Sequence, residues 1–264
     1  EGNLKKQIAP LICIPTTCGT GSEVTHESIV NNTKTLEKDC IWGPQNSVKT
    51  AIIDSEMIDH LPGKILGSTG MDALTHAVEA YVCKASNILT DAIALKAIQM
   101  IGKHLVPAVK THNEESLDAM MAASTMAGMA FGNSDVASVH SISEALGGFY
   151  DIPHGVANAM MLAPVSRLSI SGNPQKYADV AAALGIDTKN MSVIEAANAG
   201  VDLMQKMADE LEIPHFKDLD IIDPKDFDRL AKTAANADET FDNPVLMDQS
   251  DFKKLFEDLY NEGK

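Results

Sequence analysis

The sequence predicts a mainly α-helical fold preceded by a short α/β segment. From Pro62 onward the pattern is mostly helical and is broken by Gly, Pro and Asn residues. Aromatic residues make up 5% of the chain while Ala and Met are plentiful, which favours packed helices over a β-sandwich. A length of 264 residues is sufficient for one large domain or two smaller ones. We expect a β-containing domain over residues 1–60 and an all-helical domain over residues 61–264.

Short strands are expected in the N-terminal segment. Residues 10–15 form an apolar run bounded by prolines, which is typical of a buried strand. Further strands are expected at residues 51–54 and around residues 28–31.

A glycine-rich loop follows the first of these strands and reads Thr-Thr-Cys-Gly-Thr-Gly-Ser-Glu over residues 16–23. Two glycines among hydroxyl side chains let a ligand approach the backbone closely, with N–H and O–H donors nearby. Thr20 and Glu23 have the spacing of a capping box, which predicts a short helix at this point. An ordinary strand-to-helix turn explains the same spacing, and both interpretations stay open.

Nine helices are predicted after residue 60. In the second of them apolar residues recur every four positions, which indicates a stripe buried in the core. The predicted ranges are 70–82, 88–110, 114–131, 134–147, 155–171, 174–184, 191–212, 224–237 and 249–261.

The composition argues against several classes of partner. A net charge of −16 makes a nucleic-acid partner unexpected, because phosphate backbones attract basic proteins. No uninterrupted apolar run approaches the roughly 20 residues of a membrane helix, and no signal peptide is expected. The four cysteines include no Cys-x-x-Cys pair, which favours reduced thiols in the cytoplasm over a disulfide framework.

Four side chains suggest a metal site. Asp72 and His76 lie one turn apart on the predicted helix 70–82 and therefore share a face. His140 stands in an otherwise small and apolar helix, and His154 stands in a Pro-His-Gly turn. A single such histidine is more often a hydrogen-bonded core residue, but the combination makes coincidence less credible. One Asp and three His suit Fe(II), Zn(II) or Co(II) better than Mg(II) or Ca(II), and the sequence alone does not choose between iron and zinc.

Glu144 lies four residues after His140 and shares its helical face. One interpretation is a salt bridge or an exposed carboxylate near the end of that helix. The other is a proton carrier, or a group that supports the metal ligands.

Three motifs together resemble the iron-containing alcohol dehydrogenase family, also called group III alcohol dehydrogenases. They are PTTCGTGSE over residues 15–23, TGMDALTHAVEAY over residues 69–81 and YDIPHGVAN over residues 150–158. The match extends over most of residues 10–165, and Asn243-Pro244 is similar to a late Asn-Pro of the family.

The resemblance implies a helical metal-binding domain of the iron-alcohol-dehydrogenase/dehydroquinate-synthase-like type. It implies hydride transfer between a small primary alcohol or diol, or its aldehyde, and NAD or NADP, usually in a homo-oligomer. The implied metal is Fe(II), with Zn(II) as the alternative, held by Asp72, His76, His140 and His154. The implied cofactor contacts are Thr16, Thr17, Thr20, Gly21, Ser22 and Lys38.

The chain departs from the family pattern in two places. Many members carry a histidine where this chain has Glu144, so a proton relay at this position would use a carboxylate instead of an imidazole. The Gly-Gly-Gly-Ser-x-x-Asp turn of the nucleotide-binding half is absent, so residues 1–60 are expected to be a remnant of that domain. We therefore expect this chain to bind metal but to bind dinucleotide poorly.

Two alternatives stay open at this stage. The first is a lyase of the dehydroquinate-synthase type, which also combines a nicotinamide with a metal. The second is a truncated, catalytically silent fragment that binds metal or forms oligomers.

Overall fold

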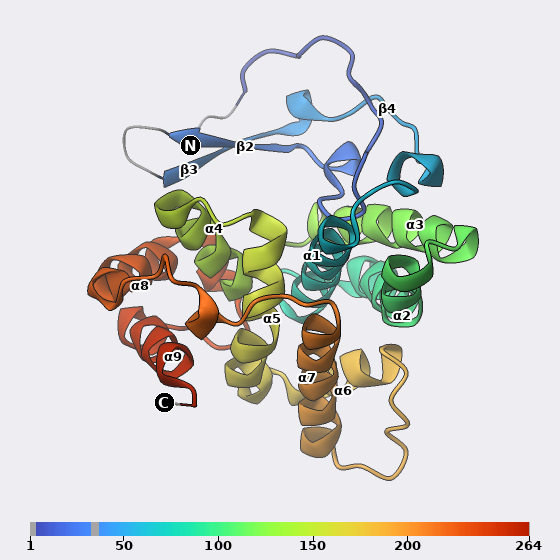
Figure 1. Cartoon of the computed structure of the whole chain (residues 1–264). Coiled ribbons are helices and arrows are strands. Elements are labelled where there is room, and N and C mark those ends of the chain that lie inside the picture. Colours follow the sequence, from blue (N-terminus) through green and yellow to red (C-terminus); the bar gives the residue numbers. More distant parts are fainter. Residues whose placement is uncertain (1–3, 33–36, 264) are drawn as a thin grey trace.

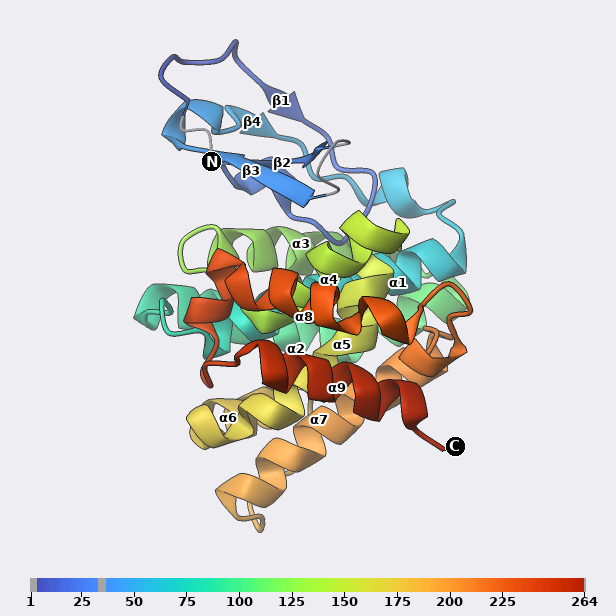
Figure 2. The same ribbon diagram turned by 90° about the vertical axis from the view of Figure 1, so that its left-hand side faces the viewer.

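The computed structural model describes residues 4–32 and 37–263. A β-containing segment lies on one side of a group of packed helices, and the view turned by 90° shows the same separation (Figure 1, Figure 2). The segment contacts the helices at two places: β3 (Glu37–Trp42) contacts α4 (Ser138–Tyr150), and a short 3-10 helix, η1 (Ser22–Val24), contacts α3 (Glu114–Phe131). The α-helices are α1 (Gly63–Val82), α2 (Ile88–Thr111), α3 (Glu114–Phe131), α4 (Ser138–Tyr150), α5 (His154–Ser169), α6 (Pro174–Ala183), α7 (Val193–Glu210), α8 (Phe227–Asn236) and α9 (Gln249–Asn261).

The strands form two separate pairs. β1 (Ile12–Cys13) is parallel to β4 (Thr50–Ala51), and β2 (Glu27–Asn32) is antiparallel to β3 (Glu37–Trp42). The 3-10 helices are η1 (Ser22–Val24), η2 (Pro44–Asn46), η3 (Ser55–Ile58), η4 (Ile170–Gly172), η5 (Phe216–Asp218), η6 (Pro224–Asp226) and η7 (Asp238–Asp242).

The strand predictions are only partly correct. The run 10–15 contains a strand of two residues, and its apolar side chains are exposed, for example Ile12 at 61%, so the expectation of a buried strand is wrong. β4 ends at Ala51, because Asp54 instead accepts a hydrogen bond from the Glu56 N–H and begins η3. β3 was not predicted, since its sequence Glu-Lys-Asp-Cys-Ile-Trp lacks a regular alternation.

All nine predicted helices are confirmed, and the mainly helical fold class with them. The largest error is at α1, which begins at Gly63 instead of residue 70. Its first turns are rich in glycine, which lowers helix propensity. Tertiary packing explains the glycines, since a Cβ at Gly67 would contact Leu211 and a Cβ at Gly70 would collide with Leu105. α4 begins at Ser138 instead of residue 134.

α1 is the central helix of the domain. It packs against α2, α3 and α5, and its residues from Leu66 to Val82 are buried apart from Thr69, which is half-buried. A helix that is buried all round has no solvent-facing side on which to place polar residues. Its polar side chains therefore need partners inside the protein.

α2 is long and apolar enough, by length and composition, to cross a membrane. It packs against both α1 and α3, and Ala97, Ile101 and Leu105 on one of its faces are fully buried. A core helix of a globular domain passes the same test, so this observation is weak support for a membrane span.

Candidate metal centre

α1 places three polar side chains on one buried face. Asp72, His76 and Glu79 follow one another at intervals of four and three residues, and each is at most 3% exposed. This spacing stacks their side chains along one line of the helix. Burying these groups costs free energy unless other groups pair with them.

α4 and α5 bring two histidines to that line. His140 is the third residue of α4 and His154 is the first residue of α5. The connection between these helices is only three residues long, and it begins with Asp151 in the left-handed conformation at φ 55°. Both histidines therefore lie near the start of a helix, and the two helices pack against each other.

The four predicted metal ligands come together. One ligand atom from each of Asp72, His76, His140 and His154 lies within 4.8 Å of the others. Nε2 of His76 is 3.0 Å from Nε2 of His140, and Oδ1 of Asp72 is 3.7 Å from Nε2 of His154. Two atoms that each lie about 2.1 Å from one ion are roughly 3.0–3.4 Å apart at octahedral or tetrahedral angles. The histidine pair therefore already has the separation of ligands that share an ion.

Protonation also suits a metal. Burial lowers the pKa of His76 to about 4, so its imidazole is neutral at pH 7. Burial alone would raise the pKa of Asp72, but His76, His154 and His140 together hold it below its usual value. A carboxylate and neutral imidazoles are the forms that coordinate a metal.

The chemistry of the cluster fits a cation. Nδ1 of His76 and Oδ1 of Asn158 are buried and have no hydrogen-bond partner among the residues described. The ring of Phe131 stacks on His76 with centroids 4.5 Å apart, so one wall is apolar. The His154 side chain is 31% exposed, compared with 4% for Asp72, so the cluster opens on the His154 side. This donor set can hold Fe(II) or Zn(II).

Two members of the site were missed at the sequence level. Asn158 is fully buried, and its Nδ2 donates to Oδ1 of Asp72 at 2.7 Å and lies 3.1 Å from Nε2 of His154. Glu79 is the partner of His140 Nδ1, and burial raises the pKa of this carboxyl to about 7. Both could have been found by extending the one-turn spacing, from His76 to Glu79 and from His154 to Asn158.

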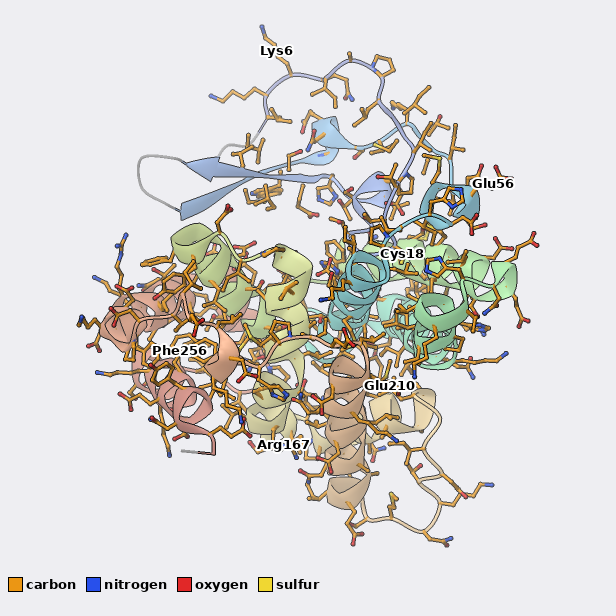
Figure 3. The ribbon with its side chains drawn as sticks, in the orientation of Figure 1. Lys6, Cys18, Glu56, Arg167, Glu210 and Phe256 are labelled. Carbon is orange, nitrogen blue, oxygen red and sulfur yellow. The ribbon has the colours of Figure 1, made fainter. Side chains whose placement is uncertain are left out.

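The glycine-rich loop lies directly against α1. A Cβ added to Gly19 would be 2.8 Å from the Thr69 carbonyl oxygen and 3.1 Å from Oδ2 of Asp72. Cys18, labelled in Figure 3 near the start of α1, is buried, and its Sγ is 4.0 Å from Thr69 Oγ1. The loop thus reaches the metal cluster itself, and glycine allows this close approach.

The same loop is also anchored on α3. Gly21 has φ 62° and faces Gly128, and the Thr125 hydroxyl donates to the buried carboxylate of Glu23 at 2.7 Å. The predicted capping box is therefore wrong. The N-cap residue of η1 is Gly21, and no side chain caps this helix, because the Glu23 carboxylate accepts a hydrogen bond from Thr125 instead.

The predicted cofactor contacts of this loop divide into two groups. Thr16, Thr20 and Ser22 are exposed and Thr17 is half-buried, so their hydroxyls are within reach of a ligand. Gly21 is buried under α3, where it has a packing role.

Comparison with known proteins decides the family. The chain matches the family model "Fe-containing alcohol dehydrogenase family, C-terminal" over residues 67–260, and the model "Iron-containing alcohol dehydrogenase" over residues 1–55. The chain belongs to the iron-containing alcohol dehydrogenase family. It is 37% identical over 259 residues to the 1,3-propanediol dehydrogenase of Citrobacter freundii. The aligned region covers 97% of this chain and 67% of that protein.

Two further relatives of the same family agree. The NAD-dependent methanol dehydrogenase of Bacillus methanolicus is 31% identical, covering 96% of this chain and 67% of that protein. A crystal structure of 1,3-propanediol oxidoreductase superposes with a TM-score of 0.93 at 35% identity, covering 98% of this chain and 68% of the other. The chain thus spans about two thirds of the length of these iron-containing alcohol dehydrogenases.

Two further residues assigned from the family resemblance stay predictions. Glu144 is half-buried on α4, one turn beyond His140, and is not part of the four-residue group. Lys38 pairs with Asn31 in the β2–β3 register, and its side chain lies outside the described part of the structure.

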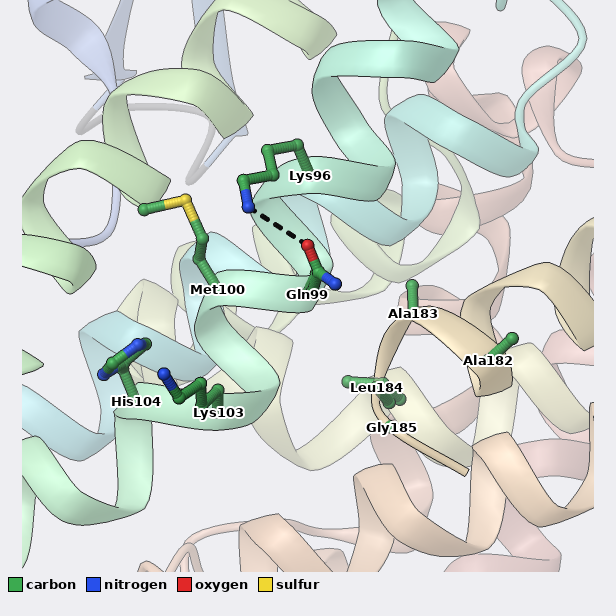
Figure 4. Close-up of a pocket in the computed structure, with 9 residues that line it drawn as sticks. All are labelled: Lys96, Gln99, Met100, Lys103, His104, Ala182, Ala183, Leu184 and Gly185. Carbon is green, nitrogen blue, oxygen red and sulfur yellow. Dashed lines mark hydrogen bonds between the residues drawn. The ribbon is translucent and has the colours of Figure 1, made fainter. Parts of the chain in front are cut away.

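An open cavity of about 520 Å³ lies between α2 and α6 (Figure 4). Lys96, Lys103 and His104 line it from α2, and Leu184 and Gly185 line it from the end of α6. None of the residues that line it belongs to the group of candidate metal ligands or to the glycine-rich loop.

Proposed function

We propose that this chain provides the metal-binding part of an alcohol dehydrogenase. The enzyme transfers a hydride between a small primary alcohol or diol, or its aldehyde, and NAD or NADP. One observation supports this most: Asp72, His76, His140 and His154 converge within 4.8 Å in a chain of the iron-containing alcohol dehydrogenase family. The printed names of the relatives, a propanediol and a methanol dehydrogenase, support a small alcohol as substrate.

The four ligands would hold Fe(II), with Zn(II) as the alternative. When bound, either metal supplies a Lewis acid that polarises an alcohol or carbonyl oxygen. The protein supplies the surroundings. Phe131 stacks on His76 and keeps water from one side, and the exposed edge of His154 marks the side from which a substrate approaches.

The glycine-rich loop is the proposed cofactor contact. The exposed hydroxyls of Thr16, Thr20 and Ser22 are available to donate hydrogen bonds to the dinucleotide. Because Gly19 lies against Asp72, a dinucleotide held by this loop is close to the metal cluster. Proximity of the two reactants is the main contribution that a binding loop makes to hydride transfer.

Glu144 is the proposed proton carrier. It is half-buried and lies on α4, one turn beyond His140. Oxidation of an alcohol releases one proton, which a carboxylate in this position can pass to water.

We also propose a cytoplasmic homo-oligomer. No disulfide joins cysteines in the described part of the chain, which suits a reducing compartment. Light scattering after size-exclusion chromatography measures the oligomeric state, and a monomer at micromolar concentration would contradict this part of the proposal.

Anaerobic metal analysis tests the ligand set. The wild-type chain is expected to retain about one equivalent of iron or zinc after desalting, and Asp72→Ala and His154→Ala are expected to lose it, because each removes one of four ligands. Unchanged metal content in both variants would show that the ligand assignment is wrong.

NAD(P)H oxidation with short aldehydes, measured after reconstitution with Fe(II) or Zn(II), tests the reaction. Turnover that the His154→Ala variant loses supports the proposed dehydrogenase. Metal binding without any turnover supports the catalytically silent fragment instead. Product formation without a net change in nicotinamide redox state would identify a lyase.

A further inference from the structure

Glu79 uses its two carboxylate oxygens for two different partners. Oε1 accepts the backbone N–H of Val139 at 2.7 Å, and Oε2 pairs with Nδ1 of His140. Glu79 belongs to α1 and is 2% exposed, while both partners belong to the first turn of α4. A single side chain thus connects the helix of Asp72 and His76 to the helix of the third ligand.

The backbone contact provides a cap for α4. The first N–H groups of a helix have no partner within the helix. The N-cap residue of α4 is Ala137, which has no side-chain acceptor, so the helix has no cap of its own. Oε1 of Glu79 supplies the missing acceptor, as the side chain of a capping residue does. This contact fixes the start of α4 relative to α1.

The second contact sets the state of the imidazole. A neutral imidazole carries one proton, and the nitrogen that faces a carboxylate is the one that donates. Nδ1 of His140 faces Glu79, so Nε2 keeps its lone pair, and Nε2 lies 3.0 Å from Nε2 of His76. The lone pair is therefore directed into the cluster.

We infer that Glu79 is the positioning residue of His140, since Oε1 holds the backbone at the start of α4 and Oε2 selects the tautomer whose Nε2 binds metal. The inference rests on the proposed metal centre. A partner of this kind, hydrogen-bonded to the second nitrogen of a ligand histidine, typically contributes 10–100-fold in metal affinity.

Glu79→Gln is the decisive variant because an amide has one acceptor oxygen where the carboxylate has two. If that oxygen accepts from Val139, the amide NH₂ faces His140 Nδ1 and forces the ring proton onto Nε2. Competition with a chromophoric chelator is expected to show a 10–100-fold weaker affinity for Co(II), with altered visible bands of the bound ion. The matched control is Glu195→Gln, a glutamate whose carboxylate accepts the Ser192 N–H at the start of α7, and it is expected to bind Co(II) as the wild type does.

The imidazole tautomer supplies a second readout that does not depend on a variant. ¹⁵N shifts of His140 in the wild-type chain are expected to show a protonated Nδ1, and a protonated Nε2 would overturn the inference. The inference would also be overturned if Glu79→Gln bound Co(II) with the affinity and the spectrum of the wild type. That result would leave the proposed metal centre intact. Failure of the wild-type chain to bind Co(II), Fe(II) or Zn(II) would instead reject the proposed metal centre.

Discussion

Asp135 lies just before α4 in a group of carboxylates. Burial raises its pKa to about 6, and the nearby carboxylates of Asp242, Glu27 and Glu79 act in the same direction, while the Val136 N–H opposes them. In the unfolded chain the pKa of an aspartate is about 3.9. The folded state therefore binds the proton more tightly. Binding of this proton stabilises the folded state. The stabilisation is fully present below the pKa of the unfolded chain, and it is lost as the pH rises through the folded-state pKa of about 6.

Asp135→Asn is therefore expected to raise the melting temperature at pH 8 and to change it little at pH 4, because the amide removes the buried charge but retains an acceptor for Val136. Thermal unfolding at the two pH values measures the effect. Asp220→Asn, at an exposed position, is the control and should be neutral at both. An equal change in the melting temperature at pH 4 and pH 8 would contradict the assignment of this pH-dependent stability to Asp135.

At the residue scale, sequence reasoning identified all four residues of the cluster. Asp72 and His76 were recognisable from their one-turn spacing, and His140 and His154 from their unusual settings. Glu79 was not recognised, because a glutamate on a helix is usually solvated. Its role depends on the position of α4, which comes from a segment 60 residues away.

Two glycines let the loop approach α3 closely. Replacing Gly128 by Ala would normally favour a helix by about 1 kcal/mol. Here the added Cβ would be 2.6 Å from the Gly21 carbonyl oxygen and 2.8 Å from its Cα. Backbone atoms cannot move aside as a side chain can. We expect Gly128→Ala to lower the free energy of unfolding by roughly 1–3 kcal/mol in urea denaturation.

The control for this comparison is Met129→Ala, the next residue of α3, which is 42% exposed and is expected to change the stability by no more than about 0.5 kcal/mol. If Gly128→Ala had the stability of the wild type, the loop would be able to move away from α3 at little cost in free energy.

Lys176 joins α6 to the α1–α2 connection. Its Nζ donates to the Tyr81 carbonyl at 2.6 Å, to Ser86 Oγ at 2.5 Å and to Oδ1 of Asp91 at 3.0 Å, and its side chain is only 19% exposed. Lys176→Met keeps most of the packing volume but leaves these acceptors unpaired. We expect a loss of roughly 1–3 kcal/mol, measured by thermal or urea unfolding. Lys96→Met, at an exposed position, should be near neutral, and an equal loss in both variants would contradict a specific role for Lys176.

At the scale of elements, helix existence was predictable and helix ends were not. The apolar periodicity of each helix is local, so it can be read along the chain. The start of α1 was missed because Gly67 and Gly70 weaken the local signal, while contacts with Leu211 and Leu105 stabilise the helix there. Those contacts lie more than 30 residues away in the sequence.

At the scale of the whole molecule, the four candidate metal ligands join α1, α4 and α5. A ligand that binds only the folded state stabilises it, by about 2.7 kcal/mol at a free concentration of one hundred times Kd. We expect Zn(II), or Fe(II) under anaerobic conditions, to raise the melting temperature, and EDTA to reverse the rise. Asp72→Ala is the control, since loss of one of four ligands should abolish the shift. A metal-dependent shift of the same size in this variant would place the bound ion elsewhere.

The N-terminal segment shows where local patterns mislead. Leu11, Ile12 and Ile14 read as a buried strand, yet their exposed fractions are 39%, 61% and 50%. An apolar run shows that a strand can be covered, but whether another layer covers it depends on the rest of the sheet. In the described residues this sheet consists of β1 and β4 alone.

The sequence by itself determined the helical class, the nine helices and the four candidate ligands, because helical periodicity and one-turn spacing are local properties of the chain. Only the tertiary structure decided that Glu79 caps α4 and holds His140, that Asn158 joins the ligands, and that the glycine-rich loop lies against Asp72. Each of these contacts joins segments far apart in the sequence. Their geometry depends on how the helices pack, so a local sequence pattern cannot predict it.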